Sequence, residues 1–262
     1  EIKPDFANAH SNLGNVLRDL GNLKEAEISI RKTIELNPDY AIAHLNLGTI
    51  LIDLGNLKES FDSYLRVIEI NPTYPNIYSL ITAFLREYDL SLINKFKLKK
   101  ILNILLEKND IYHNELFTAF NFLYSNQIIS IHEKLDSNFS QIKLLINDKI
   151  IINALKKIIF YDLKLEELLT NIRGNICNQI ANKRDFINES ELEFIIALGE
   201  QCFLNEYVYS LTEEENTSLN SIINRCIYGE MNETNISILS CYLPLYKLLD
   251  QIPLLKSFNS PN

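Results

Sequence analysis

A repeat near the start of the chain is the feature that most restricts its fold. Residues 7–40 align with residues 41–74 without a gap, and about 20 of the 34 aligned positions are identical. A fixed period of this length is typical of a pair of helices that buries its apolar face against neighbouring pairs. We therefore predict successive helical hairpins in this part of the chain.

Glycine and proline recur at the same places in both units. Leu13-Gly14 and Leu47-Gly48 fall within the first helix, where a missing side chain lets the partner helix approach closely, at a cost of about 1 kcal/mol in helix propensity. Gly21-Asn22 and Gly55-Asn56 are predicted to form the turn, because both residue types accept a positive φ. Second helices are then expected to follow each turn, over Leu23–Asn37 and Leu57–Asn71. Prolines one period apart end successive units: Pro4, Pro38 and Pro72.

The two units resemble tetratricopeptide repeats in the segments NLGNVLRDLGNLKEAEISIRKTIELNP and NLGTILIDLGNLKESFDSYLRVIEINP. The resemblance rests on a pattern of leucine, glycine, a large apolar residue, a small residue and proline. This pattern is met by Leu13, Gly14, Leu17, Ala26 and Pro38, and again by Leu47, Gly48, Leu51, Ser60 and Pro72. At three positions where the family prefers alanine the chain has Thr33, Ser60 and Val67, so slightly looser packing is expected there.

A third unit begins at Pro75 but departs from the pattern. Asn76 to Tyr88 is predicted as its first helix, although Ile81-Thr82 replaces the Leu-Gly pair and no second turn follows on the period. The array is therefore assigned to residues 1–90, with full repeats at 7–40 and 41–74 and a degenerate helix from 75. The opening phrase EIKPDF is similar to the repeat ends ELNPDY and EINPTY, so we interpret the sequence as a piece of a longer protein.

Residues 91–262 are predicted to form an all-helical module. Apolar residues keep helical spacing, and glycine and proline are too rare to indicate the hairpins of a sheet. Two of the apolar stripes are Leu98, Ile101, Leu102, Leu105 and Ile152, Leu155, Ile159, Leu163. The predicted fold class is all-α: a superhelix of tetratricopeptide helix-turn-helix units followed by an irregular α-helical module.

The resemblance places a binding site on the first helices, which line the concave surface of such arrays. Asn12 and Asn46 precede the two Leu-Gly pairs, and in similar arrays an asparagine ladder of this kind holds an extended peptide backbone. An amide suits this role because it carries both a donor and an acceptor. The alternative is that both residues cap or bridge adjacent helices. Neighbouring side chains are predicted to provide selectivity: Asn15, Arg18, Asp19, Thr49 and Asp53.

The segment Glu191–Glu215 is the most distinctive part of the module. Thr212 and Glu215 form a T-x-x-E capping box that predicts a helix start. Together with CYLPLYKL at 241–248, the segment resembles the helical region between tetratricopeptide repeats and a methyltransferase domain in some bacterial proteins, over about residues 191–249.

A methyltransferase needs a glycine-rich strand-to-helix turn for its cofactor, and the isolated glycines Gly174, Gly199 and Gly229 do not provide one. We therefore predict no catalytic residue and no cofactor site in these residues. The alternative function is that of a non-catalytic recruiting segment in a larger S-adenosylmethionine-dependent methyltransferase.

Composition restricts the partners further. A net charge of -9 argues against nucleic acid, and the strongest basic cluster, Lys95, Lys97, Lys99 and Lys100, is spaced like the solvated face of a helix. No apolar stretch approaches the roughly 20 residues of a membrane span.

The histidines and cysteines are scattered along the sequence. Without a C-x-x-C pair or a histidine cluster, no metal site is expected. The cysteines are interpreted as core residues in a reducing cytoplasm: Cys177, Cys202, Cys226 and Cys241. The predicted partner is a protein or extended peptide, and self-association through exposed Phe and Tyr side chains of the module is a third possibility.

Overall fold

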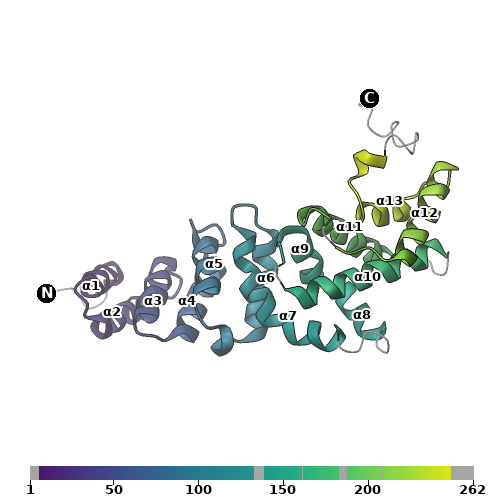
Figure 1. Ribbon diagram of the computed structural model, residues 1–262. Helices are drawn as coiled ribbons and strands as arrows, with labels where there is room; N and C mark the ends of the chain where they lie inside the picture. Colours follow the sequence, from purple (N-terminus) through teal and green to yellow (C-terminus); the bar gives the residue numbers. More distant parts are fainter. Residues whose placement is uncertain (1–5, 133–138, 161, 183–187, 208, 249–262) are drawn as a thin grey trace, which may run out of the picture. The chain divides into compact units, whose positions relative to one another are not determined.

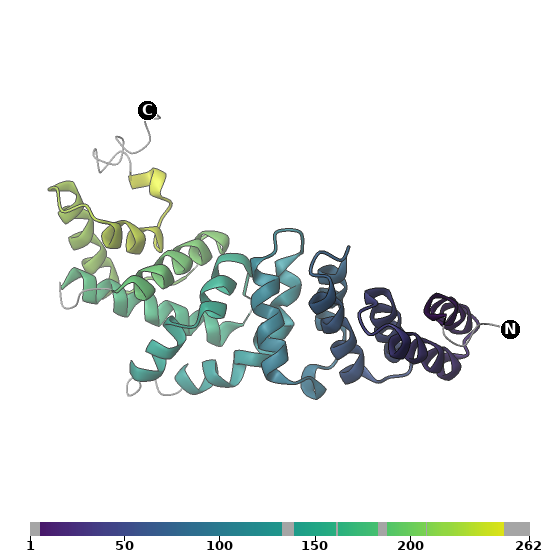
Figure 2. The ribbon, with the colours of Figure 1, turned by 180° about the vertical axis from the view of Figure 1, so that it is seen from behind.

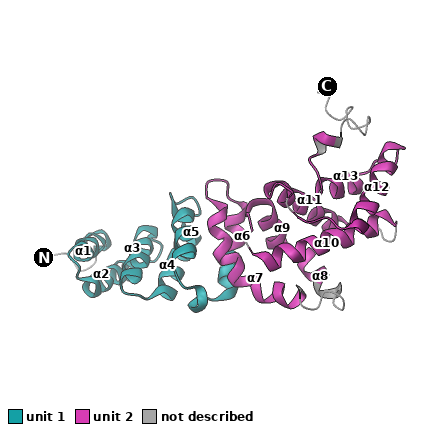
Figure 3. Ribbon diagram, viewed as in Figure 1, with its two compact units in different colours: residues 1–101 teal, residues 102–262 magenta. Residues whose placement is uncertain are grey.

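The computed structural model describes residues 6–132, 139–160, 162–182, 188–207 and 209–248 (Figure 1). All regular secondary structure in these ranges is helical, with thirteen α-helices, three short 3₁₀ helices and no strand. The prediction of an all-α fold is therefore confirmed. The chain divides into two compact units, residues 1–101 and residues 102–262 (Figure 3).

Unit 1 begins with two helical hairpins, which lie one after the other in both views (Figures 1 and 2). Its helices are α1 (Ala7–Asp19), α2 (Leu23–Leu36), α3 (Ala41–Asp53), α4 (Leu57–Ile70) and α5 (Ile77–Glu87), followed by η1 (Leu90–Leu92). The boundary between the units falls within α6 (Lys95–Glu107). The second helices end one residue earlier than predicted, because Asn37 and Asn71 leave the helical conformation and become C-caps.

Glycine has the two roles in each hairpin that its spacing predicts. Gly21 and Gly55 have φ values of 79° and 78°, which residues with a side chain rarely adopt, and they reverse the chain between the two helices. In the middle of α1 and α3 the close approach of the second helix requires glycine. A Cβ atom on Gly14 would lie 2.6 Å from Ile30 Cδ1, and one on Gly48 would lie 2.4 Å from Tyr64 Cε1.

The core of unit 1 runs through successive hairpins. Apolar residues of α2 and α3 form one buried cluster: Ala26, Ile30, Ala43, Leu47, Ile50 and Leu51. Aromatic residues continue the core from α4 to α5, where the ring centroids of Phe61 and Phe84 lie 5.5 Å apart. The positions that depart from the alanine preference, Thr33, Ser60 and Val67, are fully buried. The Ser60 hydroxyl donates to the backbone oxygen of Gly48 at 2.8 Å, so its polar group is satisfied.

Unit 2 is built around two long helices. Helix α11 packs against α9 and α13, while α10 packs against α7 and α12. The elements after α6 are η2 (His113–Leu116), α7 (Phe117–His132), α8 (Phe139–Ile146), α9 (Lys149–Lys157), α10 (Leu163–Ala181), α11 (Glu189–Leu204), α12 (Glu213–Ile227), α13 (Glu233–Ser240) and η3 (Leu245–Leu248).

The predicted stripe from Ile152 to Leu163 does not lie on one helix. Helix α9 ends at Lys157, and Ile158 is extended, with φ -108° and ψ 129°. A new helix then begins because the Asp162 side chain accepts a hydrogen bond from the backbone nitrogen of Leu165 at 2.9 Å. Leu163 is consequently an exposed residue in the first turn of α10.

Candidate functional site

The two ladder asparagines lie at equivalent positions on the first helices of the two hairpins. Asn12 is exposed on α1, and Asn46 is half-buried on α3. Neither side chain hydrogen-bonds to an adjacent helix within the described residues. The Nδ2 atom of Asn46 is enclosed and has no hydrogen-bond partner there, and the same is true of Oδ1 of Asn15. These are unused polar atoms on the predicted binding face.

The residues predicted to provide selectivity differ in how freely they can reach a ligand. Arg18 Nη2 lies 3.3 Å from Asp19 Oδ1, so these neighbours form an ion pair near the surface. Asp53 is exposed at the equivalent position on α3. The Thr49 hydroxyl donates to the backbone oxygen of Leu45 at 3.2 Å and lies 3.4 Å from the Tyr64 hydroxyl. Thr49 is therefore occupied within its own hairpin.

Helix α5, the first helix of the third unit, continues only part of this surface. Leu80 stands one period after Asn46 and is partly exposed, so the amide is replaced by an apolar side chain. An ion pair like that of Arg18 and Asp19 does recur on α5, where Arg86 Nη2 lies 2.6 Å from Glu87 Oε1. Arg86 and Glu87 stand two periods after Arg18 and Asp19. The ladder of amides is thus confined to α1 and α3 within the described repeats.

Comparison with known families agrees with these hairpins. Residues 11–75 match the model of a family described as Tetratricopeptide repeat. The N-terminal hairpins are tetratricopeptide repeats. A search of curated proteins found no match for the chain. Tetratricopeptide repeats generally mediate interactions between proteins.

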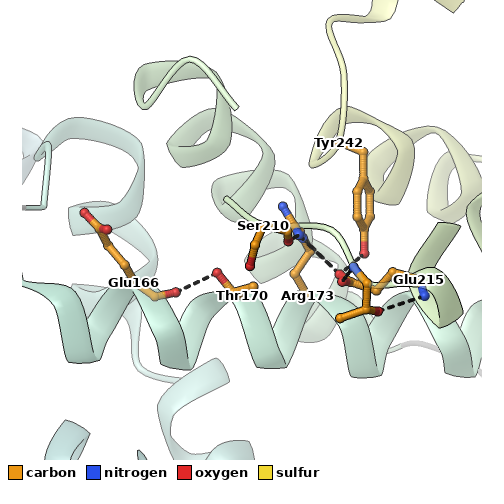
Figure 4. Close-up of polar contacts among 7 residues, drawn as sticks. Glu166, Thr170, Arg173, Ser210, Glu215 and Tyr242 are labelled. Atoms are coloured by element: carbon orange, nitrogen blue, oxygen red, sulfur yellow. Dashed lines mark hydrogen bonds and ion pairs between the residues drawn. The ribbon is translucent and has the colours of Figure 1, made fainter. Parts of the chain in front are cut away.

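Beyond the tetratricopeptide repeats, a buried charged network joins three parts of unit 2 (Figure 4). Arg173 on α10 and Glu215 on α12 are only 2% and 3% exposed, and Arg173 Nη2 lies 3.2 Å from Glu215 Oε1. The same guanidinium donates to the backbone oxygen of Ser210 at 2.6 Å. The Tyr242 hydroxyl donates to Glu215 Oε1 at 2.8 Å, and the Arg173 Cζ atom lies 4.3 Å from the centroid of the Tyr242 ring. The network is closed to solvent, which favours a structural role.

Glu215 also performs the capping that the sequence predicts. The Glu215 backbone nitrogen donates to Thr212 Oγ1 at 3.1 Å. The Thr212 backbone nitrogen donates to Glu215 Oε2 at 2.9 Å, which completes the capping box. The second role, as partner of Arg173, was missed at the sequence level because the two residues are 42 positions apart. The signal in the sequence was a charged residue, Arg173, beside Gly174 within an otherwise apolar stripe. The structure shows that Gly174 leaves room for Glu215, because a Cβ on Gly174 would lie 3.1 Å from the Glu215 carboxyl carbon.

Other distinctive residues of the 191–215 segment also hold helices together. Gln201 is fully buried and, in the amide orientation that satisfies its nitrogen and oxygen, donates to the backbone oxygens of Leu155 and Ile158 at 2.7 and 2.9 Å. It therefore binds the carbonyl end of α9. Asn205 Nδ2 donates to the Tyr209 hydroxyl at 2.9 Å. The second contact links Asn205, directly after α11, to Tyr209 in the segment that precedes α12.

The four cysteines are buried and carry free thiols. Burial raises the pKa of the Cys177 thiol to about 11. A hydrogen bond with Cys241 lowers the pKa of Cys202, and burial raises that of Cys241. In the described ranges, no group of three or more histidine, cysteine or acidic side chains is arranged to hold a metal ion. None of the described helices is both long and apolar enough to cross a membrane.

An apolar hollow lies at the end of α11 in unit 2. Exposed Phe203 and Tyr246 line it together with Tyr207, and the Phe203 and Tyr207 rings meet edge to face with centroids 6.4 Å apart. Exposed aromatic side chains of this kind are what the self-association hypothesis requires. The four lysines of the basic cluster, by contrast, are exposed, and Lys97 Nζ pairs with Asp62 Oδ1 at 2.6 Å, which agrees with a solvated helix face.

Proposed function

We propose that the first helices of the tetratricopeptide repeats bind an extended peptide segment of a partner protein. The observation that carries this proposal is the pair of repeat-equivalent asparagines, Asn12 and Asn46, neither of which is used to bridge helices in the described part of the chain. Stacked repeats place equivalent residues one after another along the array, so the two amides can meet different peptide groups of one extended segment.

Hydrogen-bond energetics support this assignment. A buried donor without a partner, such as Asn46 Nδ2, costs roughly 1–3 kcal/mol. A carbonyl oxygen of a bound peptide would satisfy it after a small side-chain rotation. Because an amide can both donate and accept, the ladder would hold a peptide backbone irrespective of its side chains. We therefore propose sequence-tolerant binding along the ladder.

Selectivity would come from the flanking polar side chains. Asp19 and Asp53 occupy equivalent exposed positions and favour basic residues in the bound segment. Asn15 adds an unused acceptor, and Arg18 adds a donor beside Asp19. Thr49 contributes least, since its hydroxyl is already bonded within the hairpin.

The test is affinity for peptides selected from a random library on the whole chain. In fluorescence anisotropy, the double variant Asn12→Ala/Asn46→Ala should weaken a selected peptide by about tenfold or more, the loss expected for one or two hydrogen bonds. Asn175→Ala, which removes an exposed amide on α10, should leave the affinity unchanged. Circular dichroism establishes that each variant is folded. Equal affinity of the folded double variant and the unaltered chain would refute the ladder.

The second candidate is that these residues recruit substrates for a larger S-adenosylmethionine-dependent methyltransferase. It is favoured by the resemblance of residues 191–249, in which Gln201 joins α11 to α9 and Glu215 joins α12 to α10. Such a module is suited to lie between the repeats and a neighbouring domain. Calorimetry of the protein encoded by the complete gene should then detect S-adenosylmethionine binding. No heat of binding would remove this candidate.

Self-association is the third candidate and rests on the apolar hollow of unit 2. Phe203→Ser should abolish any concentration-dependent increase in mass seen by sedimentation, whereas one constant mass of the unaltered chain over a wide concentration range would exclude self-association.

The free, scattered cysteines favour a reducing compartment, so we place the proposed partner in the cytoplasm.

A further inference from the structure

The apolar hollow of unit 2 is lined by aromatic rings from two elements. Phe203 at the end of α11 and Tyr246 in η3 are 63% and 66% exposed, and Tyr207 lines the hollow with them. The planes of the Phe203 and Tyr207 rings meet at 79°, so the two rings form a corner. The face of an aromatic ring attracts a cation, because the ring quadrupole is negative there. Several rings around one hollow are therefore suited to hold an organic cation.

The backbone that presents Tyr207 has an uncommon conformation. Glu206 and Tyr207 have φ values of 53° and 58°, a region that favours glycine. The Glu206 backbone nitrogen donates to the backbone oxygen of Phe203 at 3.0 Å. The Tyr207 backbone nitrogen donates to that of Cys202 at 2.8 Å. Glycine would adopt the same conformation without strain, so a tyrosine at this position indicates a use for the ring that lines the hollow.

The charged side chains at the hollow leave one carboxylate for a ligand. Lys156 and Glu200 both line it. Lys156 Nζ lies 3.6 Å from Glu193 Oε1, so an acidic neighbour already balances the lysine charge. Glu200 is exposed and has no ion pair among the described residues. A carboxylate beside aromatic rings favours a cation whose charge is covered by methyl groups, because a bare ammonium group is strongly hydrated.

The size and openness of the hollow favour a cation that is attached to a protein. Its volume is about 600 Å³, which is more than one trimethylammonium group fills. Sites for free small molecules usually bury most of the ligand surface. Here Phe203 and Tyr246 remain more than half exposed, so a free cation would stay largely in water. A methylated lysine needs cover only for its head, and the remaining room accommodates its aliphatic stem.

We propose that the apolar hollow binds a quaternary ammonium group carried on a trimethylated lysine side chain of a partner protein. Phe203, Tyr207 and Tyr246 contact the methyl groups with their rings. Glu200 supplies the opposite charge. The proposal is independent of peptide binding by the asparagine ladder, because the hollow lies within unit 2. It competes with self-association, which would fill the same hollow.

The experiment titrates the whole chain with three peptides and follows binding by NMR. Each peptide is rich in glycine and serine and differs from the others at one central residue: trimethyllysine, unmodified lysine, or a neutral isostere in which a tert-butyl group replaces the trimethylammonium group. The isostere keeps the shape of the head and removes its charge. The trimethyllysine peptide should bind about tenfold more tightly than either of the others, the ratio expected when contacts of a cation with two or three rings are lost.

Variants of the chain assign this preference to the hollow. Phe203→Leu removes a ring but keeps an apolar side chain at an exposed position, so it should weaken the trimethyllysine peptide by about threefold or more and leave the isostere unchanged. Glu200→Gln should also weaken the trimethyllysine peptide, and more so at low salt. Tyr228→Leu is the matched control, because it removes a ring that is 86% exposed, directly after α12 and outside the hollow. It should leave the affinity unchanged.

Three results would overturn the proposal. The first is a trimethyllysine peptide that does not bind, or binds no more tightly than the isostere, because the hollow would then not recognise a cation. The second is free choline bound as tightly as the trimethyllysine peptide, since a small organic cation would then suffice. The third is a dimer that Phe203→Ser abolishes but a saturating amount of the trimethyllysine peptide does not dissociate, because a second copy of the chain would then occupy the hollow.

Discussion

At single residues, close packing sets the stability of the hairpins. Gly48 allows the Tyr64 ring to lie directly on the α3 backbone, and the hydroxyls of Tyr64 and Thr49 lie 3.4 Å apart. The adjacent Ser60 hydroxyl donates to the backbone oxygen of Gly48. One missing side chain therefore permits a polar and an aromatic contact between the two helices. Such a position cannot accept even a methyl group without displacing Tyr64.

Gly48→Ala should destabilise unit 1. The new Cβ would lie 2.4 Å from Tyr64 Cε1, and overpacking of this kind costs about 1–3 kcal/mol, which outweighs the gain of about 1 kcal/mol in helix propensity when the ring cannot move. Urea denaturation followed by circular dichroism measures the loss. Ser79→Ala, at an exposed helical position of α5, is the control and should be neutral or slightly stabilising. A Gly48→Ala protein as stable as the unaltered chain would show that the ring shifts freely.

At the level of elements, a few buried polar contacts decide how the helices of unit 2 are joined. The Arg173–Glu215 pair links α10 to the start of α12, and Tyr242 after α13 completes it. Gln201 attaches α11 to the end of α9. Each contact satisfies a polar group that burial would otherwise penalise by several kcal/mol. The same residues therefore determine which helices are neighbours.

Glu215→Gln should be strongly destabilising. It leaves the Arg173 guanidinium buried without a carboxylate, a change that typically costs about 3 kcal/mol or more. Glu214→Gln removes the same charge at the adjacent position, where the side chain is exposed and bonds only to Asn178 among the described residues, so it should cost less than about 1 kcal/mol. Chemical denaturation of the two variants gives the comparison. Equal losses would mean that Glu215 acts only through the helix start.

At the scale of the whole molecule, the two units carry different chemical probes. All four cysteines belong to unit 2, and the sequence of unit 1 contains none. At pH 8 a thiol with the pKa of Cys177, about 11, is ionised in only about one molecule in a thousand, and it is buried as well. Thiol labelling of the native protein therefore reports the opening of unit 2 alone.

Labelling with a thiol reagent should be slow in the native chain and complete in denaturant. Glu215→Gln should accelerate it, because unit 2 opens more often when the Arg173 pair is broken. Gly48→Ala should leave the labelling rate unchanged while it lowers the stability of the repeats. If Gly48→Ala accelerates labelling as much as Glu215→Gln does, the two units unfold together.

The sequence by itself determined the repeats, since their signals are local. The repeats are recognised without reference to distant residues, from a period of 34, from glycines at the turns and at the helix contact, and from apolar stripes at helical spacing. The family match over residues 11–75 agrees with this assignment. The capping box at Thr212 and Glu215 was predictable for the same reason. The helix break at Ile158 was not, because its apolar spacing continues across the break.

Only the tertiary structure decided which distant groups meet. The partner of Arg173 lies 42 residues away, and the spacing of apolar residues identifies a buried stripe without identifying the residues that cover it. The same holds for Leu13 and Leu47, which occupy equivalent positions of the repeat but differ in exposure. Burial depends on the neighbouring element, which a local pattern does not contain.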